Sequence, residues 1–158
     1  MTAYTYGTVE AIEADDELLA CSTLPRIDHV DVHVVHIAPA ALDSPESWIR
    51  EILERTSAAM RVRLRAGWTM LGIGLHHGEA DTVAGWRIAH TSAEYVRLHG
   101  DSRLGLTGQL IARVTEDGVV FATVAQLSNP VARSVWARVL PTHLTIVRSL
   151  LQDAAERV

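Results

Sequence analysis

The sequence predicts an α+β protein in which a curved antiparallel β-sheet wraps around one long C-terminal helix. Three observations carry this prediction: an amphipathic helical pattern closes the chain, a series of period-two segments precedes it, and two short helical patterns lie nearer the N-terminus. Helices that are segregated from a meander of strands are typical of the α+β class. The length of 158 residues fits a single domain, from residue 1 to residue 158, with a sizeable core.

The closing helix is predicted from residue 130 to residue 158. Asn129 can cap the free amides of a first turn, and Pro130 suits the first helical position. Apolar residues then recur at spacings near three and four, which places them on one face of the helix. These residues are Val131, Val135, Trp136, Val139, Leu144, Val147, Leu150, Leu151 and Ala154. Such a face needs a partner, and the predicted sheet supplies it.

The first strand is predicted over residues 28–37, where valines alternate with polar side chains. The valine positions are Val30, Val32 and Val34, and the polar positions are His29, Asp31 and His33. Pro39 is expected to end this strand, because proline cannot donate a ladder hydrogen bond. The residues before 24 give no clear pattern beyond a short helix or turn with acidic residues at its front.

Two short helices are predicted after this strand. One begins after Ser44 and Pro45 and runs for about three turns, and the second runs from Ala58 to Leu71. Period-two segments follow, which we interpret as antiparallel strands, over residues 85–91, 94–99, 104–114 and 119–127. A hairpin signal at residues 116–118 joins the last two.

Composition excludes several classes of protein. The formal net charge is −5, which disfavours nucleic acid as a partner. No apolar run approaches the length of a membrane span, and the first ten residues lack a signal-peptide pattern, so we expect a cytoplasmic location. No phosphate-binding glycine loop, nucleophile elbow or HExxH motif occurs, and we therefore expect no cofactor.

The order of elements resembles the helix-grip superfamily, which includes START lipid carriers, the major birch pollen allergen and bacterial polyketide cyclases. Particular residues resemble an uncharacterised bacterial branch of that superfamily. They are Leu24, Pro25, Asp28 and Asp31 before Trp48, then Glu94, Gly100, Asp101 and Leu104, and finally Asn129, Arg133, Trp136, Pro141 and His143. One departure is Thr142, because related endings often carry an aromatic residue between the proline and the histidine.

The resemblance implies a helix-grip fold with an apolar cavity between the sheet and the last helix, and two short helices plugging one end. It implies no particular reaction, since the superfamily contains carriers, cyclases, hydrolases and proteins with no known ligand. The smaller Thr142 is expected to enlarge or reshape the cavity.

For an enzyme of this kind, we expect cofactor-independent acid–base chemistry of the cyclase or dehydratase type. The candidate catalytic residues are His33, His90, Tyr95, Arg97 and His143. His143 is the preferred acid or base because it lies among apolar neighbours on the long helix and because the resemblance marks its position. The alternative for His143 is a buried histidine bonded to a strand carbonyl.

Large apolar side chains are the candidates for contact with a small apolar or aromatic ligand. They are Trp68, Trp86, Leu104, Leu106, Phe121 and Trp136. The same residues at in-phase positions also suit an ordinary core. The second hypothesis is therefore an interaction protein, whose cavity is filled by its own side chains and whose sheet edge or last helix forms a homodimer.

His29, Asp31 and His33 also raise the question of a metal. Alternate residues of a strand lie roughly 6.5–7 Å apart, so these three cannot converge on one ion without help from another element. We interpret them as a solvated or hydrogen-bonded strand face, and we predict no metal site.

Overall fold

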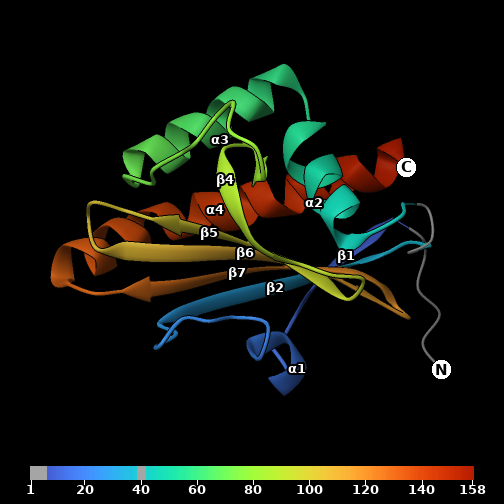
Figure 1. Cartoon of the computed structure of the whole chain (residues 1–158), viewed down its shortest axis with the longest axis horizontal. Coiled ribbons are helices and arrows are strands. Elements are labelled where there is room, and N and C mark those ends of the chain that lie inside the picture. The colour runs from blue at the N-terminus through green and yellow to red at the C-terminus, as the bar shows by residue number, and fades with distance from the viewer. Residues whose placement is uncertain (1–6, 39–41) are drawn as a thin grey trace.

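The computed structural model describes residues 7–38 and 42–158, and Figure 1 shows their arrangement. Seven strands form one curved, open, antiparallel sheet with the order β1-β2-β7-β6-β5-β4-β3. Their bounds are β1 Thr8–Ile12, β2 His29–His36, β3 Thr82–Val83, β4 Trp86–Thr91, β5 Tyr95–Asp101, β6 Leu106–Thr115 and β7 Gly118–Leu127. The predicted α+β class, with a long closing helix, is confirmed.

Four helices accompany the sheet, namely α1 Asp16–Leu19, α2 Pro45–Glu54, α3 Ala58–Met70 and α4 Pro130–Arg157. Side-chain caps set the starts of the longer three. Ser44 accepts a hydrogen bond from the amide of Ser47, and Asn129 accepts one from the amide of Ala132. In both cases a proline follows at the first helical position, as the sequence predicts.

The strand predicted as the first is the second, because β1 precedes it. β1 pairs with β2 in an antiparallel register that sets Val9 opposite Val35. Val9 is the only residue of this five-residue strand that is fully buried, so the strand carries almost no apolar signal. The two predicted helices therefore follow β2, and Pro39, where we expected β2 to end, lies outside the described residues.

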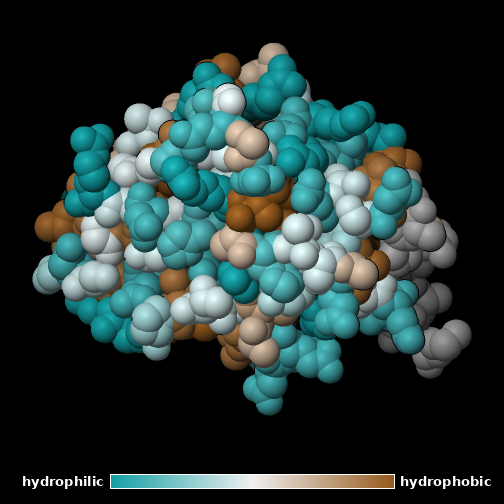
Figure 2. Space-filling view, viewed as in Figure 1, coloured by the Kyte–Doolittle hydropathy of each residue, from teal (hydrophilic) through white to brown (hydrophobic). Residues whose placement is uncertain are grey.

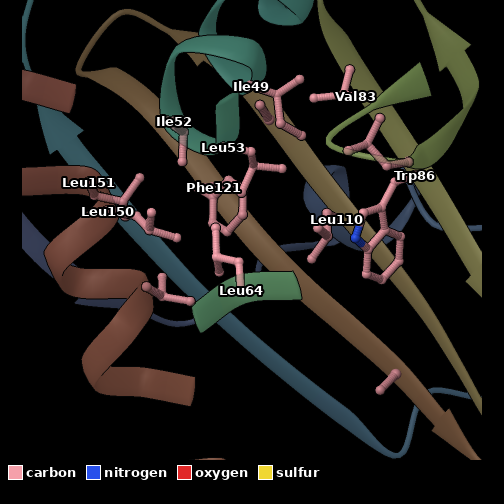
Figure 3. Packing of buried hydrophobic residues seen from close by; sticks show 14 of the residues in the cluster. Ile49, Ile52, Leu53, Leu64, Val83, Trp86, Leu110, Phe121, Leu150 and Leu151 are labelled. Carbon is pink, nitrogen blue, oxygen red and sulfur yellow. The ribbon is translucent and has the colours of Figure 1, made fainter. Parts of the chain in front are cut away.

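Helices α2, α3 and α4 lie on one side of the sheet, and α1 lies on the other (Figure 1). The main core is on the side of the three longer helices. Apolar side chains of α2 and α4 converge there on Phe121 of β7 (Figure 3), and they include Ile49, Ile52, Leu53, Leu150 and Leu151. This packing closes one end of the space between sheet and α4.

A second, smaller core lies on the opposite side, beneath α1. Leu18 and Cys21 pack there against valines of β2 and apolar residues of β6 and β7. The fully buried Gln109 accepts hydrogen bonds from the Ser22 hydroxyl and the Thr23 amide, which fastens this segment to the sheet. Because the valines of β2 face α1, the alternate face with His29, Asp31 and His33 is turned toward α4. The three side chains of that face are largely buried, and His29 and Asp31 are hydrogen-bonded to each other.

None of the helices among the described residues combines the length and the apolar character that a membrane crossing requires. The surface in Figure 2 is mostly hydrophilic, with hydrophobic residues gathered in separate small areas. Two exposed apolar side chains, Val62 and Met70, belong to α3.

Candidate functional site

A cavity of about 490 Å³ lies between the sheet, α3 and α4. Helix α3 forms its cover, and this helix is loosely anchored, since Leu64 is its only buried residue. The sheet contributes a floor of small and apolar side chains from β6 and β7, including Leu106, Gly108 and Ala125. A volume of this size accommodates a small organic ligand.

The cavity meets solvent between α3 and α4. Exposed residues that line it mark this mouth: Arg63 and Met70 on α3, and Arg138 and Thr142 on α4. Thr142 thus stands at the opening, where the resemblance expects an aromatic residue. Its small side chain leaves the entrance wider than an aromatic ring would.

Two tryptophans form one wall. Trp68 of α3 and Trp86 of β4 meet edge to face, with ring centroids 5.5 Å apart. The indole of Trp86 lies over Gly100 and Gly108, which are paired across β5 and β6. A Cβ atom added at Gly100 would come within 2.7 Å of this ring. The glycine pair therefore provides the space in which Trp86 lies.

The polar end of the cavity is built around Asp31. Nε2 of His29 lies 2.6 Å from Oδ2 of Asp31, and Nε2 of His143 lies 2.9 Å from the same oxygen. Trp136 packs beside both imidazoles, with ring centroids 4.9 Å from His29 and 5.1 Å from His143. His143 also lines the cavity, as does Thr123, which is paired with Asp31 across β2 and β7. The cluster thus borders the cavity through these two residues.

Burial and hydrogen bonding act on Asp31 in opposite directions. Burial by itself raises the pKa of this carboxyl group, but the hydrogen bonds from His143 and His29 outweigh it and lower the pKa to about 2. Asp31 is therefore an anion at neutral pH, although its side chain is only 10% exposed. The cluster holds a buried negative charge that nitrogen donors stabilise.

His33 lies beside this cluster but makes no hydrogen bond to Asp31. Its Nδ1 lies 3.7 Å from Oδ1 of Asp31, and neither atom has a hydrogen-bond partner within the described part of the chain. The side chain of His33 is 6% exposed, and burial lowers its pKa. Two buried polar atoms are thus left without a hydrogen-bond partner among the described residues, which is uncommon in native structures.

The structure separates the five candidate catalytic residues into two groups. His33 and His143 lie on the side of α4, beside Asp31. His90, Tyr95 and Arg97 lie on the other side of the sheet, where Arg97 donates a hydrogen bond to the carbonyl of Cys21. The rings of His90 and Tyr95 stack there, with centroids 4.2 Å apart. These three residues cannot act on a molecule held in the cavity.

The candidate ligand contacts also divide. Four of the six line the cavity, namely Trp68, Trp86, Leu106 and Trp136. Phe121 lies in the closed core below α2 (Figure 3), and Leu104 lies in the loop between β5 and β6. Neither of these two lines the cavity.

The sequence alone does not predict that His29 and Asp31 share a site with His143. The alternation along β2 places these residues on one face of the strand, and their spacing means that a site must include a side chain from another element. That element is α4, which supplies His143. The alternative of a bond from His143 to a strand carbonyl is replaced by its bond to the Asp31 carboxylate.

Comparison of the chain with protein-family models, with curated proteins and with solved structures gives no match. The fold and the site therefore carry the functional argument.

Proposed function

We propose that this protein binds a small apolar or aromatic molecule in the cavity between the sheet, α3 and α4. The observation that carries the proposal is the cavity of about 490 Å³, whose wall is largely apolar and includes three tryptophans. Pockets of this size and lining, with a few convergent polar groups, are typical of small-molecule sites. His143 and Thr123 are the polar groups at the inner end.

We further assign the chain to the helix-grip superfamily as part of this proposal. The curved sheet, the long closing helix and the two helices inserted after β2 support that assignment. The position of the cavity between sheet and α4 agrees with the resemblance of the sequence. Fold alone does not choose between a carrier and an enzyme.

Proton-transfer chemistry of the cyclase or dehydratase kind is the second candidate function. The bond between Asp31 and His143 supports it, because a carboxylate that accepts from Nε2 holds the imidazole in one orientation and one tautomer. The other ring nitrogen, Nδ1, is then the atom that takes or gives a proton. In this proposal, His143 acts on a ligand carbon or oxygen at the inner end of the cavity.

The alternative of an interaction protein with a filled cavity has less support. It requires side chains to occupy the space beside Trp136, and Trp136 instead lines the open cavity. A homodimer remains compatible with ligand binding.

Gly67 offers a direct test of ligand binding. This glycine lies on α3 and lines the cavity, and a Cβ added there meets no atom within 4 Å. Gly67→Phe is expected to occupy the cavity without strain in the helix, whereas Gly67→Ala adds little volume and serves as the matched control. Both substitutions raise the helix propensity of α3.

The measurement is native mass spectrometry of the purified protein with a panel of apolar and polycyclic aromatic compounds. We expect a bound mass with the natural protein and Gly67→Ala, and its loss with Gly67→Phe. Absence of any bound mass across the panel, or equal binding by all three proteins, would contradict the proposal. Thermal unfolding of each variant checks that the fold is intact.

A further inference from the structure

We propose that His29, Asp31 and His143 form a binding site for one divalent first-row transition metal ion, with zinc as its redox-inert representative. Two histidines and one carboxylate are a donor set that such ions prefer. The proposal does not depend on the proposed ligand function, because metal binding can be measured with the metal alone.

The ligand atoms of the three residues converge on one point. One ligand atom from each of the three residues lies within 4.8 Å of the other two. Two of these separations, from Asp31 Oδ2 to the Nε2 atoms of His29 and His143, are 2.6 and 2.9 Å. Ligand atoms around a tetrahedral zinc ion, at roughly 2.0–2.2 Å from the metal, lie about 3.3–3.6 Å apart. The two short separations must therefore widen by about 0.4–1.0 Å to admit an ion.

Regular elements and packed neighbours hold the three ligands in place. His29 and Asp31 come from the first three residues of β2, where the strand is paired with β7, and His143 comes from the helix that packs on the sheet. Trp136 contacts both imidazole rings and restricts their orientation. Ligands that are held by rigid elements and by packed neighbours favour a defined site over a surface cluster.

The cluster and the neighbouring His33 contain two buried polar atoms that lack hydrogen-bond partners in the described part of the chain. Oδ1 of Asp31 and Nδ1 of His33 are buried and have no hydrogen bond within the described residues. In metal sites, a second shell of hydrogen bonds holds the ligating carboxylate. His33, at 3.7 Å from Oδ1, is placed to supply that bond once Oδ2 binds the metal. A metal ion bound to Oδ2 of Asp31 would therefore explain why Oδ1 of Asp31 and Nδ1 of His33 lie near each other without a hydrogen bond.

The cluster borders the cavity, which gives an ion and its further ligand a route to the site. His143 and Thr123 line the cavity, so a metal held by three protein ligands has its open coordination position near the inner end of that cavity. Three protein ligands with one open position are the pattern of catalytic sites, whereas structural zinc sites use four. Water or an oxygen atom of a cavity ligand is the fourth donor that this arrangement takes.

The test begins with the full chain, stripped by a chelator and dialysed. Zn²⁺ alone is then titrated by calorimetry, and Co²⁺ alone by visible absorption. We expect one saturable equivalent per chain and a Co²⁺ spectrum with the intensity of four- or five-coordination. Asp31→Asn and His143→Gln should weaken binding by more than the roughly 10- to 100-fold that is usual for loss of an outer-shell partner. His33→Gln should fall within that range.

The matched control is the double substitution of His76 and His77 by Gln, since these adjacent histidines lie outside the strands, next to Glu79. It should leave affinity unchanged. A further variant, His143→Cys, keeps a ligand and should add a sulfur-to-cobalt charge-transfer band, which identifies position 143 without depending on lost binding. No saturable binding by the natural protein would overturn the proposal. So would binding that the loop variant abolishes and His143→Gln does not.

Discussion

Nε2 of His143 lies 2.9 Å from Oδ2 of Asp31, and 112 residues of chain separate the two. Asp31 belongs to β2, the second strand from one edge of the sheet, and His143 belongs to α4, so this bond joins the sheet to the closing helix. Both side chains are largely buried, at 16% and 10% exposed. The contact therefore links β2 to α4, and through His143 it also borders the cavity.

A double-mutant cycle measures the coupling across this link. Asp31→Asn and His143→Gln should each lower the free energy of unfolding by about 1–3 kcal/mol, because each leaves a buried polar partner unsatisfied. Their combined effect should be smaller than the sum, with a coupling of about 0.5–3 kcal/mol. Urea denaturation of the chelator-treated protein provides the values.

Glu94→Gln is the control for that cycle, since Glu94 is exposed and its side chain makes no hydrogen bond among those described. Its effect should stay within about 0.5 kcal/mol. Strict additivity of the two substitutions in the cycle would show that the residues are not coupled in solution.

Gly100 sets the position of the cavity wall. Gly100→Ala brings a Cβ to 2.7 Å from the Trp86 ring, which is closer than carbon atoms pack. We expect Trp86 to be displaced, with a loss of about 1–3 kcal/mol from overpacking and a changed tryptophan emission spectrum. Gly74→Ala is the control, because its nearest contact would be an ordinary 3.9 Å. Equal stability of the two variants would mean that Trp86 does not lie on Gly100.

Much of the fold was predictable because it depends on local signals. Asn129 and Pro130 predict the start of the closing helix, and residues 116–118 predict the turn between β6 and β7. β1 was not predictable in this way. It is an edge strand held by backbone pairing to β2, and its largely exposed side chains show no burial pattern.

The candidate site was predictable only in part, for a different reason. Alternation along β2 separates the valines from His29, Asp31 and His33, but it does not say which face meets α4. That choice depends on Leu18 and Cys21, which cover the valine face from a segment with little pattern of its own. The polar face is then the one that α4 covers, and the partner residue can be known only from the tertiary structure.

Cys21 should be slow to react with alkylating reagents in the native protein. Burial raises the pKa of its thiol, so at a given pH the reactive thiolate is a smaller fraction than in free cysteine. The alkylation rate should therefore rise at higher pH than in the denatured chain, and burial of the side chain should slow it further. Alkylation rates with iodoacetamide, measured by quenching the reaction at several pH values with and without denaturant, test this difference. Equal rate profiles in both states would contradict it.

Glu51 of α2 forms ion pairs with two arginines that differ in burial, and this difference should decide their effects on stability. Arg157, at the end of α4, is 30% exposed and lies 2.8 Å from Oε1 of Glu51, while it also bonds to the Glu51 carbonyl. Arg55 is 75% exposed and lies 3.5 Å from Oε2.

We expect Arg157→Gln to lower the free energy of unfolding by about 1–3 kcal/mol, because it leaves the largely buried Glu51 carboxylate with a poorer partner and releases the end of α4 from α2. Arg55→Gln should cost no more than about 1 kcal/mol, since an exposed ion pair is screened by water. Chemical denaturation of the two variants in the same buffer gives the comparison. A larger loss for Arg55→Gln would mean that α4 is not anchored through Glu51, and that the packing of Leu150 and Leu151 alone holds this end of the helix.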